Sequence, residues 1–381
     1  MGQRAMQLDE LFRGTGAATP GIEISGLSAS SRQLRPGNLF LACAGQRHHG
    51  LRYLAQALAA GAKAVAWEPG AGIDAPVMPA GVPAFSVPEL GRWQGRLADR
   101  FYGAPSSRLG VTGITGTNGK TTVAWLVAQA LEACGRPAAY SGTLGYGRLP
   151  ALSATALTTP GSVEVHRRLA EFVDAGAEHA VLEVSSHALD QGRVDAVRFA
   201  VAALTNISRD HLDYHGDMQS YAEAKAKLFV DCPARHRIIN IDTDFGEELV
   251  GRCGPDAVAV STCCDRVARD GRHVCARTVA AGPEGSHVTF QSSWGDGELR
   301  IPMPGEFNVA NGLIVLATLL VDGVSITDAC RALESVTAPP GRMENVPSAA
   351  GAPTAYVDFA HTPEALNVAL NALRPHCENQ L

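Results

Sequence analysis

The stretch GVTGITGTNGKTTVAWLV, residues 110–127, decides the fold. An apolar run enters a glycine-rich loop, and Gly119-Lys120-Thr121 then opens a helical pattern. A strand, such a loop and a helix together are typical of a phosphate-binding site, because backbone N–H groups and the helix N-terminus attract an anion. The spacing is unusual, since Ile114 stands where the common pattern has its first glycine. A glycine turn without a ligand is the alternative interpretation.

Outward from this loop, predicted strands and helices alternate. Strands are predicted at 109–115, 180–185, 199–206, 237–242 and 257–261, and helices at 120–134, 162–175, 219–230, 308–320 and 326–334. This alternation predicts an α/β fold with a doubly wound, mostly parallel sheet, in which ligands bind at the carboxyl ends of the strands. Short alternating segments between 272 and 302 predict an antiparallel portion.

The flanking regions suggest two further domains. Strands predicted at 22–30, 38–44 and 64–67, with a helix at 53–60, indicate a small N-terminal α/β domain. A strand and helix within 355–373, where Thr362 caps and Pro363 begins the helix, indicate the start of a C-terminal α/β domain. We therefore expect domains at 1–104, 105–338 and 339–381. The last is far shorter than the ~100 residues of a typical domain, so we expect a C-terminally truncated chain.

Composition excludes several classes of protein. The 381 residues carry a net charge of -6 without a block of like charge, so neither nucleic acid nor an anionic membrane surface is an expected partner. The longest apolar run, Leu313 to Val321, is too short to cross a bilayer. The nine cysteines are scattered and odd in number, which favours reduced thiols. We expect a cytoplasmic protein.

Glu183 is the first candidate for the chemistry of the site. It ends a predicted buried strand at the edge of the sheet that carries the phosphate loop. A carboxylate there needs a cation, and Mg²⁺ bound to a nucleoside triphosphate and to the hydroxyl of Thr121 supplies one. A capping carboxylate is the alternative.

Two other patterns admit different chemistry. Ser185, Ser186 and His187 are the residue types of a serine hydrolase, although no G-x-S-x-G turn surrounds them. His211 and His215 have the i, i+4 spacing of zinc ligands, although Leu212 stands where a zinc protease has Glu.

The wording of the loop, TGTNGKTT at 115–122, resembles the ATP loop of the Mur ligases, in which the shifted glycine is normal. Further stretches agree in the same order: Thr158-Thr159, EVSSHALDQGRV (183–194), TNISRDHLDYHGDMQSYAEAKAKLF (205–229), GEFNVANGL (305–313), GRME (341–344) and VDFAHTPEAL (357–366). The resemblance covers nearly the whole chain. It is strongest to members that add the third amino acid of the peptidoglycan stem peptide.

The resemblance implies an ATP-dependent amide-bond ligase that requires ATP and Mg²⁺. Its implied substrates are UDP-MurNAc-L-Ala-D-Glu and a diamino acid, with meso-diaminopimelate favoured over L-lysine. ATP would phosphorylate the γ-carboxylate of the D-glutamyl residue, and the amine would attack the acyl phosphate. The expected oligomeric state is a monomer.

The resemblance also implies site residues. The ATP-binding set is Gly116, Thr117, Asn118, Gly119, Lys120, Thr121, Thr122, Asn308, Arg342 and Asp358. The substrate-binding set is Ser31, Gln46, Arg47, His48, Thr158, Thr159, Ser185, Gln191 and Arg193. The catalytic set is Lys120, Glu183, His211 and Lys225, and the metal ligands are Thr121, Glu183, His211 and Lys225 as its carbamate. Asn308 is alternatively a helix cap.

Three positions depart from the family pattern. Ser30 and His49 stand where an acidic residue is usual near the uracil contacts, and Leu157 stands where some relatives have Asn. Alternative functions are a phosphotransferase or hydrolysing switch, an inactive nucleotide-binding remnant, and another Mur or folylpolyglutamate-type ligase.

Overall fold

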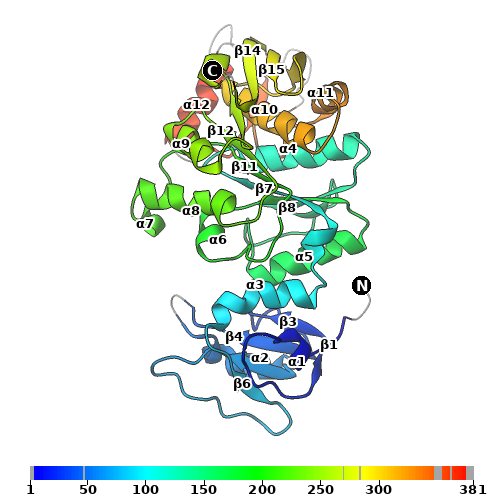
Figure 1. Ribbon diagram of the computed structural model, residues 1–381, viewed down its shortest axis with the longest axis vertical. Coiled ribbons are helices and arrows are strands. Elements are labelled where there is room, and N and C mark those ends of the chain that lie inside the picture. Colours follow the sequence, from blue (N-terminus) through cyan, green and yellow to red (C-terminus); the bar gives the residue numbers. More distant parts are fainter. Residues whose placement is uncertain are drawn as a thin grey trace. The chain divides into compact units, whose positions relative to one another are not determined.

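The computed structural model describes residues 4–45, 48–268, 270–282, 285–346, 354–360 and 363–374. These residues form two compact units (Figure 1). The first unit comprises Met1–Arg108, Pro160–Ala175 and Gln191–Val197, and the second comprises Leu109–Thr159, Gly176–Asp190 and Arg198–Leu381. The first unit is therefore built from three separate stretches of the chain. The three-domain division at 104 and 338 remains a prediction.

The first unit holds a parallel sheet of four strands in the order β3-β4-β5-β6 within the described chain. Its elements are β1 (Met6–Gln7), α1 (Leu8–Leu11), β2 (Glu23–Ile24), β3 (Gly26–Ser28), β4 (Asn38–Ala42), η1 (Gly50–Tyr53), α2 (Leu54–Ala59), β5 (Ala64–Trp67), β6 (Ala84–Ser86), α3 (Leu90–Phe101), η2 (Pro105–Arg108) and α5 (Ser162–Asp174). The strand predicted at 22–30 is wrong as a single strand. β2 pairs with β1, whereas β3 joins the four-stranded sheet.

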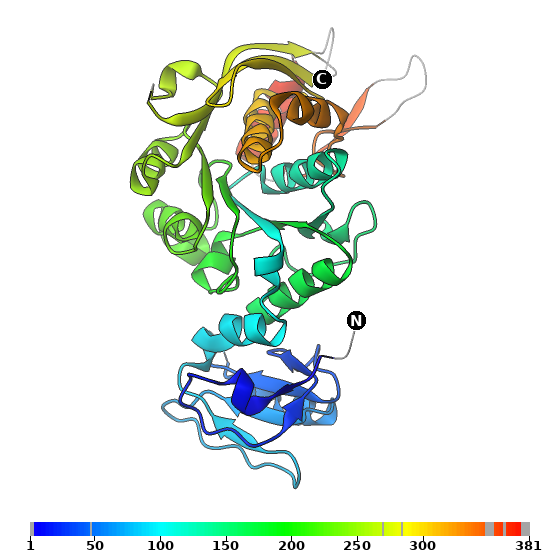
Figure 2. The same ribbon diagram turned by 45° about the vertical axis from the view of Figure 1, so that its right-hand side comes forward.

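Helix α5 completes the hydrophobic core of the first unit. Val163 and Ala170 of α5 are buried in the same cluster as Leu97 and Phe101 of α3 and Leu39 of β4. Because these apolar side chains leave water together, α5 stabilises the first unit although the sequence places it between strands of the second. Figure 2 shows α3, in cyan, beside α5, in green.

The second unit holds a ten-stranded sheet in the described chain, ordered β16-β15-β14-β13-β12-β11-β7-β10-β8-β9. Its strands are β7 (Gly110–Thr115), β8 (Ala138–Gly142), β9 (Gly145–Arg148), β10 (His179–Glu183), β11 (Val201–Leu204), β12 (His236–Asn240), β13 (Val258–Ser261), β14 (Arg272–Gly282), β15 (Gly285–Ser292) and β16 (Gly297–Ile301). The pairings from β8 through β10, β7, β11, β12 and β13 to β14 are parallel. The prediction of a mostly parallel, doubly wound sheet is confirmed.

Helices cover both faces of this sheet. They are α4 (Lys120–Ala133), α6 (Ser186–Asp190), α7 (Leu212–His215), α8 (Met218–Val230), α9 (Asp244–Cys253), α10 (Glu306–Val321) and α11 (Ile326–Ser335). Ile114 packs in one core with α4, α10 and α11. A side chain at the adjacent Gly113 would instead meet Leu228 of α8. Since neighbouring strand residues point to opposite faces, α8 covers the face opposite α4.

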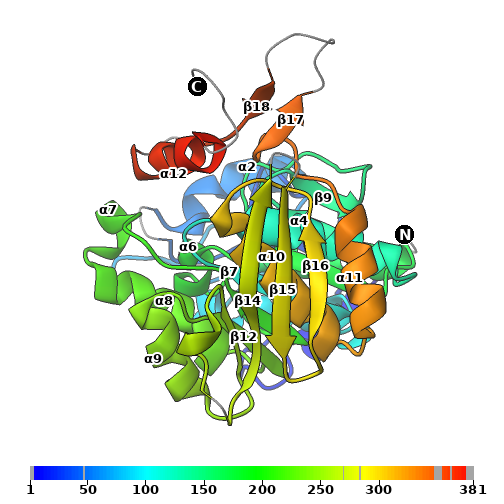
Figure 3. The ribbon, with the colours of Figure 1, turned by 90° about the horizontal axis from the view of Figure 1, so that it is seen from above.

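The antiparallel portion predicted at 272–302 is also confirmed. β14, β15 and β16 lie side by side and extend the large sheet (Figure 3). After α11, the described chain forms a two-stranded sheet of β17 (Glu344–Val346) and β18 (Ala355–Val357), followed by α12 (Pro363–Leu373). Thr362 lies outside the described residues, so its capping role stays a prediction.

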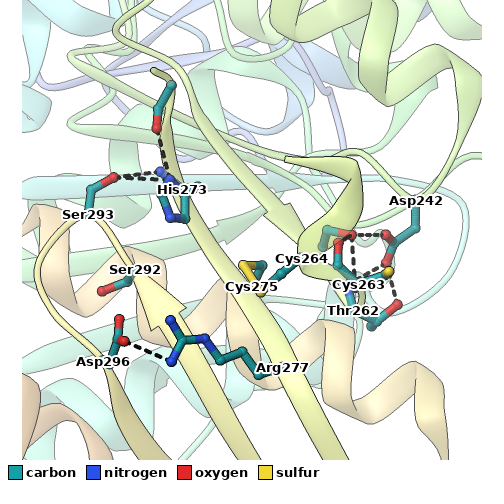
Figure 4. The surroundings of a disulfide bond; sticks show 12 residues. Asp242, Thr262, Cys263, Cys264, His273, Cys275, Arg277, Ser292, Ser293 and Asp296 are labelled. Carbon is teal, nitrogen blue, oxygen red and sulfur yellow. Dashed lines mark hydrogen bonds and ion pairs between the residues drawn. A yellow bond between two sulfur atoms is a disulfide. The ribbon is translucent and has the colours of Figure 1, made fainter. Parts of the chain in front are cut away.

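A disulfide joins Cys264 and Cys275, with the two Cα atoms 5.1 Å apart (Figure 4). The expectation that every cysteine is a reduced thiol is therefore wrong for this pair. Pairing of Ser261 with Cys275 brings β14 beside the short helix η3 (Cys264–Arg266) that follows β13. The Cα separation lies within the range that a disulfide spans.

No described helix is both long enough and apolar enough to cross a membrane.

Candidate nucleotide and substrate site

The glycine loop turns directly from β7 into α4, as the sequence predicts. Gly119 precedes the first residue of α4 with φ 82°. Gly116 has φ 150°, and a Cβ there would lie 1.9 Å from the Thr205 hydroxyl oxygen. Both positions need glycine, because an L side chain there meets either strain or a neighbouring atom. The first N–H groups of α4 thus lie at the carboxyl edge of the sheet, where they can receive an anion.

The segment after β11 holds the loop in this shape. The backbone N–H of Thr117 donates to the Asn206 carbonyl at 3.0 Å, and that of Asn118 donates to the Asn206 side chain at 3.0 Å. The Thr117 hydroxyl also accepts from the Ser208 N–H at 3.0 Å. These contacts fix the loop before any ligand binds. Sequence reasoning did not single out Asn206 or Ser208, although both lie in the family-like stretch 205–229.

Two lysines converge on the Gly116 carbonyl. Lys120 donates to it at 2.9 Å and to the Thr117 carbonyl at 2.8 Å, while Lys225 donates to it at 2.7 Å. Burial lowers the pKa of the Lys120 ammonium, which nearby Glu183 opposes. Burial, and then the charge of Lys120, hold the pKa of Lys225 well below its ordinary value. The two amino groups therefore lie close together beside the loop, where burial disfavours the charged form of each.

Glu183 ends β10 with a side chain that is 1% exposed. Its carboxylate accepts from the Thr121 hydroxyl at 2.9 Å, the Thr143 N–H at 2.8 Å and the Tyr140 hydroxyl at 2.5 Å. These donors satisfy a buried anion. They also place a carboxylate and a threonine hydroxyl, both hard oxygen ligands, beside the phosphate loop, and this donor set suits Mg²⁺. Tyr140 and Thr143 were missed by sequence reasoning, because neither belongs to a motif.

Lys225 is buried on α8, with its ammonium 4.3 Å from the centre of the Tyr221 ring. The Tyr221 hydroxyl lies 3.1 Å from the Thr117 hydroxyl, so Tyr221 links the surroundings of Lys225 to the phosphate loop. The His211 ring contacts Tyr221 with a centroid distance of 6.3 Å, but it is largely exposed and lies near Asp210. The structure thus brings Lys225 to the loop and places His211 beside Tyr221.

The hydrolase and zinc alternatives gain no support. Ser186 is 2% exposed and bonds to His215 at 3.0 Å, so its hydroxyl is closed to a substrate. Ser185 accepts from the Ala188 N–H at the start of α6. Across the residues that the structure describes, no three His, Cys, Asp or Glu side chains gather into a possible metal site. A Mg²⁺ ion would therefore use the threonine hydroxyl and ligand oxygens as well.

Of the three remaining nucleotide candidates, Asn308 lies on α10, whereas Arg342 and Asp358 flank β17 and β18. Asn308 is within α10 and does not cap it. It donates to the Pro304 carbonyl at 2.8 Å and accepts from Asn311 at 3.1 Å. Arg342 stacks on Phe359, and its charge lowers the pKa of Lys120. Asp358 accepts from the Met343 N–H at 2.9 Å. Arg342 and Asp358 therefore belong to one β17–β18 structure whose charge reaches the phosphate loop.

The substrate candidates of the second unit adjoin Glu183. The Thr159 hydroxyl donates to the Glu183 carbonyl at 2.7 Å and accepts from the Ser185 N–H at 3.1 Å. The Thr158 hydroxyl lies 3.0 Å from that of Thr143. Thr159 and Ser185 are therefore linked to the backbone of Glu183, and Thr158 is linked to its carboxylate through Thr143.

The other substrate candidates belong to the first unit. Ser31 is buried and donates to Gln56 at 2.9 Å, whereas His48 is exposed and lies 3.0 Å from Arg52. Gln191 accepts from Arg193 at 2.6 Å. Gln46 and Arg47 lie outside the described residues, so the predictions for them are untested.

Two family models match the sequence. The description "Mur ligase middle domain" covers residues 114–319, and "Mur ligase family, catalytic domain" covers residues 23–102. A UDP-N-acetylmuramoyl-L-alanyl-D-glutamate–2,6-diaminopimelate ligase from Xanthomonas campestris pv. campestris is 44% identical over 380 residues, spanning 99% of this chain and 75% of the relative. The Pseudomonas aeruginosa protein with the same name is 42% identical over 376 residues, with the same shares covered. A solved structure of an enzyme of that name matches with a TM-score of 0.80 at 28% identity, covering 99% of this chain and 75% of its own.

Proposed function

The chain belongs to the Mur ligase family and is an ATP-dependent ligase of peptidoglycan synthesis, and we propose from this premise that it adds the third amino acid of the stem peptide. The substrate would be UDP-MurNAc-L-Ala-D-Glu. The amine would be meso-diaminopimelate rather than L-lysine, and the names of the relatives support this choice as far as 2,6-diaminopimelate. The reaction would take place in the cytoplasm, with a monomeric enzyme.

The observation that carries the proposal is the convergence of Lys120, Thr121, Glu183 and Lys225 at the phosphate loop. Lys120 and Lys225 share the Gly116 carbonyl, and Thr121 bonds to Glu183. An ATP γ-phosphate bound over Gly116–Lys120 would replace the backbone carbonyls as the partner of Lys120. The lysine charge would then offset the negative charge that builds up on the transferring phosphoryl group.

A carboxylate resists attack by an amine because oxide is a poor leaving group, so we infer an acyl phosphate. The γ-carboxylate oxygen of the D-glutamyl residue would attack the γ-phosphorus of ATP, and the bond to ADP would break. The amine would then attack the acyl carbon and release phosphate. Thr121 and Glu183 would hold Mg²⁺, which supplies charge neutralisation when bound. Electrostatics and positioning supply most of the catalysis in phosphoryl transfer.

Lys225 has the environment that carbamate formation requires. Only a neutral amine attacks CO₂, and burial together with Lys120 lowers the pKa of Lys225, so that more of the neutral amine is present at neutral pH. The carbamate would convert a cation into an anion beside Lys120. Lys225 would then serve, with His211, as a ligand for a second Mg²⁺.

The remaining candidate residues would bind the nucleotide-sugar substrate and the adenosine of ATP. Thr158, Thr159 and Ser185 adjoin Glu183 and would hold the dipeptide near the reacting carboxylate. Ser31, Gln46, Arg47 and His48 would bind the uridine end, and Gln191 and Arg193 the muramoyl-dipeptide. Asn308, Arg342 and Asp358 would contact the adenosine of ATP.

One assay tests the proposal: ADP release with and without UDP-MurNAc-L-Ala-D-Glu and a panel of amines, in the presence of Mg²⁺ and bicarbonate. A ligase of this kind releases ADP only with both co-substrates and fastest with its own amine. Lys120→Ala should lower turnover by about two to three orders of magnitude, while Lys63→Ala, an exposed lysine of the first unit, is the control. ADP release without an amine would instead indicate a switch or phosphotransferase. ATP binding without turnover would indicate an inactive remnant.

A further inference from the structure

The turn Gln191–Val197 belongs to the first unit and carries two of the proposed substrate contacts, Gln191 and Arg193. Two backbone hydrogen bonds between residues three apart shape this turn. The Asp195 N–H donates to the Gly192 carbonyl and the Val197 N–H donates to the Val194 carbonyl, both at 3.1 Å. Val194 and Val197 are buried, at 2% and 1% exposure. The turn is therefore anchored by its second half, while Arg193 and Gln191 bond to each other in its first half.

The Asp195 carbonyl is the point where two helices hold this turn. A Cβ at Gly95 of α3 would lie 2.5 Å from this carbonyl oxygen, so the absence of a side chain permits the close approach. From α5, His166 Nε2 lies 2.9 Å from the same oxygen. Because a carbonyl only accepts, Nε2 carries the proton and donates it. Helices α3 and α5 lie side by side, as Figure 1 also shows.

The other nitrogen of His166 has an unfavourable neighbour. His166 Nδ1 lies 3.6 Å from Asp99 Oδ1 of α3, and both atoms are buried without a hydrogen-bond partner among the residues that the structure describes. With the proton on Nε2, a neutral imidazole presents its Nδ1 lone pair to a carboxylate oxygen. Two acceptors then face each other in a site where the His166 side chain is 0% exposed. One added proton would turn this repulsion into an ion pair.

We propose that His166 is the positioning residue for the substrate turn Gln191–Val197, and that a proton shared with Asp99 sets how firmly it holds the turn. The proposal rests on the proposed function, because that function makes Gln191 and Arg193 substrate contacts. Burial lowers the pKa of His166, against the opposing influence of the Asp195 carbonyl and of Asp99. A lowered pKa favours the neutral imidazole of His166 at neutral pH. The turn is held more tightly as the pH falls through that lowered pKa.

The other charged groups on the elements packed against His166 have partners of their own or are exposed. On α5, Arg167 pairs with Glu164 and Glu171, and Arg168 pairs with Glu164. On α3, Arg100 donates to backbone carbonyls of residues 10, 11 and 13. The short helix η2 contributes Arg108, which is exposed, and the turn itself contributes the Asp195 carboxylate beside Gly192. Asp99 is the charged side chain that acts on the pKa of His166.

The test uses the full chain and three substitutions. Asp99→Asn replaces a carboxylate with an amide that can donate to Nδ1, so the contact becomes favourable without a proton. His166→Gln keeps a donor for the Asp195 carbonyl but does not titrate. His166→Leu removes the donor. Asp74→Asn, an exposed carboxylate of the same unit, is the matched control.

Binding of UDP-MurNAc-L-Ala-D-Glu is measured by calorimetry from pH 5.5 to 8, without ATP. The wild-type Kd should rise as the pH increases through the lowered pKa of His166, whereas Asp99→Asn should bind at every pH at least as tightly as wild type binds at the lowest pH. His166→Leu should weaken binding about tenfold, the effect of a buried carbonyl left unpaired, and His166→Gln should restore it. The kcat at saturating substrate should stay within about twofold of the wild-type value in all variants, because the contact of His166 with the turn affects substrate binding and not the chemical step.

Hydrogen exchange of the Asp195 and Val197 amides supplies a readout that needs no substrate. Exchange should be faster in His166→Leu and slower in Asp99→Asn. Exchange rates that are independent of both residues overturn the proposal, as does a fall in kcat at unchanged Kd. Failure of the wild type to bind the nucleotide sugar refutes the proposed function. The amide exchange rates then test, without substrate, whether His166 and Asp99 hold the turn.

Discussion

At the scale of single residues, the candidate site depends on buried groups whose charge costs free energy unless a partner offsets it. Glu183 has its partners in Thr121, Tyr140 and Thr143. Among the described residues, Lys225 donates to one backbone carbonyl, that of Gly116, and lies over the face of the Tyr221 ring. A buried ammonium with so few partners is the less stable of the two. Burial of charge at this site is therefore least well compensated at Lys225.

Lys225 should make stability depend on pH in a defined direction. Its pKa in the folded chain lies well below 10.5 because burial and Lys120 disfavour the ammonium. Between that lowered value and 10.5 the unfolded chain binds a proton that the folded chain lacks, so the free energy of unfolding rises with pH in this window. Lys225→Met should flatten the rise and abolish ligase activity. Urea denaturation from pH 7 to 10 in CO₂-free buffer measures the slopes.

Lys227→Met on the same helix is the control, since the Lys227 side chain is 39% exposed and pairs with Asp190. Equal slopes for wild type and Lys225→Met would show that the buried amine is not the source of the pH dependence. Activity of the wild type should also increase on adding bicarbonate, and that of Lys225→Met should not.

Individual residues were predictable from sequence only where a motif or family pattern named them. Lys120 and Thr121 follow from the loop itself, and Glu183 follows from its place at a strand end. Tyr140 and Thr143 lie on and after β8, which the alternating pattern did not reveal, so nothing in the sequence connected them with Glu183. The pair His166 and Asp99 is equally invisible, because it depends on the packing of two helices that are distant in sequence.

At the scale of elements, the turn from β7 into α4 is the most constrained feature of the second unit. Gly116→Ala should lower the free energy of unfolding by about 1–3 kcal/mol, the range for overpacking, and remove ATP binding. The added Cβ would lie 1.9 Å from the Thr205 hydroxyl oxygen, at a backbone φ of 150° that L residues rarely adopt. Thermal unfolding and nucleotide titration measure the two effects.

Gly251→Ala is the matched control, because Gly251 lies within α9 and a Cβ there meets nothing within 4 Å. That variant should be slightly more stable than wild type, since Ala favours a helix over Gly. If both alanine variants bound ATP normally, the loop would not have the close packing described for it.

The disulfide provides a second prediction at this scale. It closes a loop with a sequence separation of 11 between η3 and β14. Cross-links of this size stabilise a fold by about 2–3 kcal/mol, largely by restricting the unfolded chain. Cys275→Ala should therefore be less stable than wild type by about that amount, measured without reductant, and dithiothreitol should reduce the difference.

Cys263→Ser is the control for this experiment, because Cys263 is a free, exposed thiol beside the disulfide (Figure 4). Its stability should respond to dithiothreitol as the wild type does. A wild-type protein whose stability is the same with and without the reductant would show that the cross-link contributes nothing.

Most elements of the second unit were predictable, because long apolar strands and capped helices have strong periodic signals. The predicted helix at 120–134 corresponds to α4, which spans Lys120–Ala133. Helix α3 of the first unit was missed despite its amphipathic pattern, and α9 lies in a stretch for which no element was predicted.

The prediction of one strand at 22–30 is wrong because the Ser25 N–H donates to the Gly37 carbonyl and separates β2 from β3. Such a break is set by tertiary contact rather than by local sequence.

At the scale of the whole molecule, the discontinuity of the first unit has a testable consequence. The sequence predicts an N-terminal domain at residues 1–104, and one family model matches 23–102. The compact unit nevertheless takes in Pro160–Ala175 and Gln191–Val197. Val163 and Ala170 of α5 lie in its core, and His166 is fully enclosed there. The sequence gives no sign of this, because α5 follows the regular strand-helix rhythm of the second unit.

Residues 1–108 produced alone should therefore not fold as a native-like domain. Without α5, the apolar face of α3 loses its cover, and exposed apolar surface of this kind favours a loosely packed state. We expect retained far-ultraviolet circular dichroism, binding of a hydrophobic dye and no cooperative thermal transition. Adding a synthetic peptide of residues 160–175 should restore a transition, whereas the same peptide with Val163→Asp and Ala170→Asp should not. A cooperative melt of the fragment alone, at the temperature of the first transition of the full chain, would mean that α5 is dispensable to this unit.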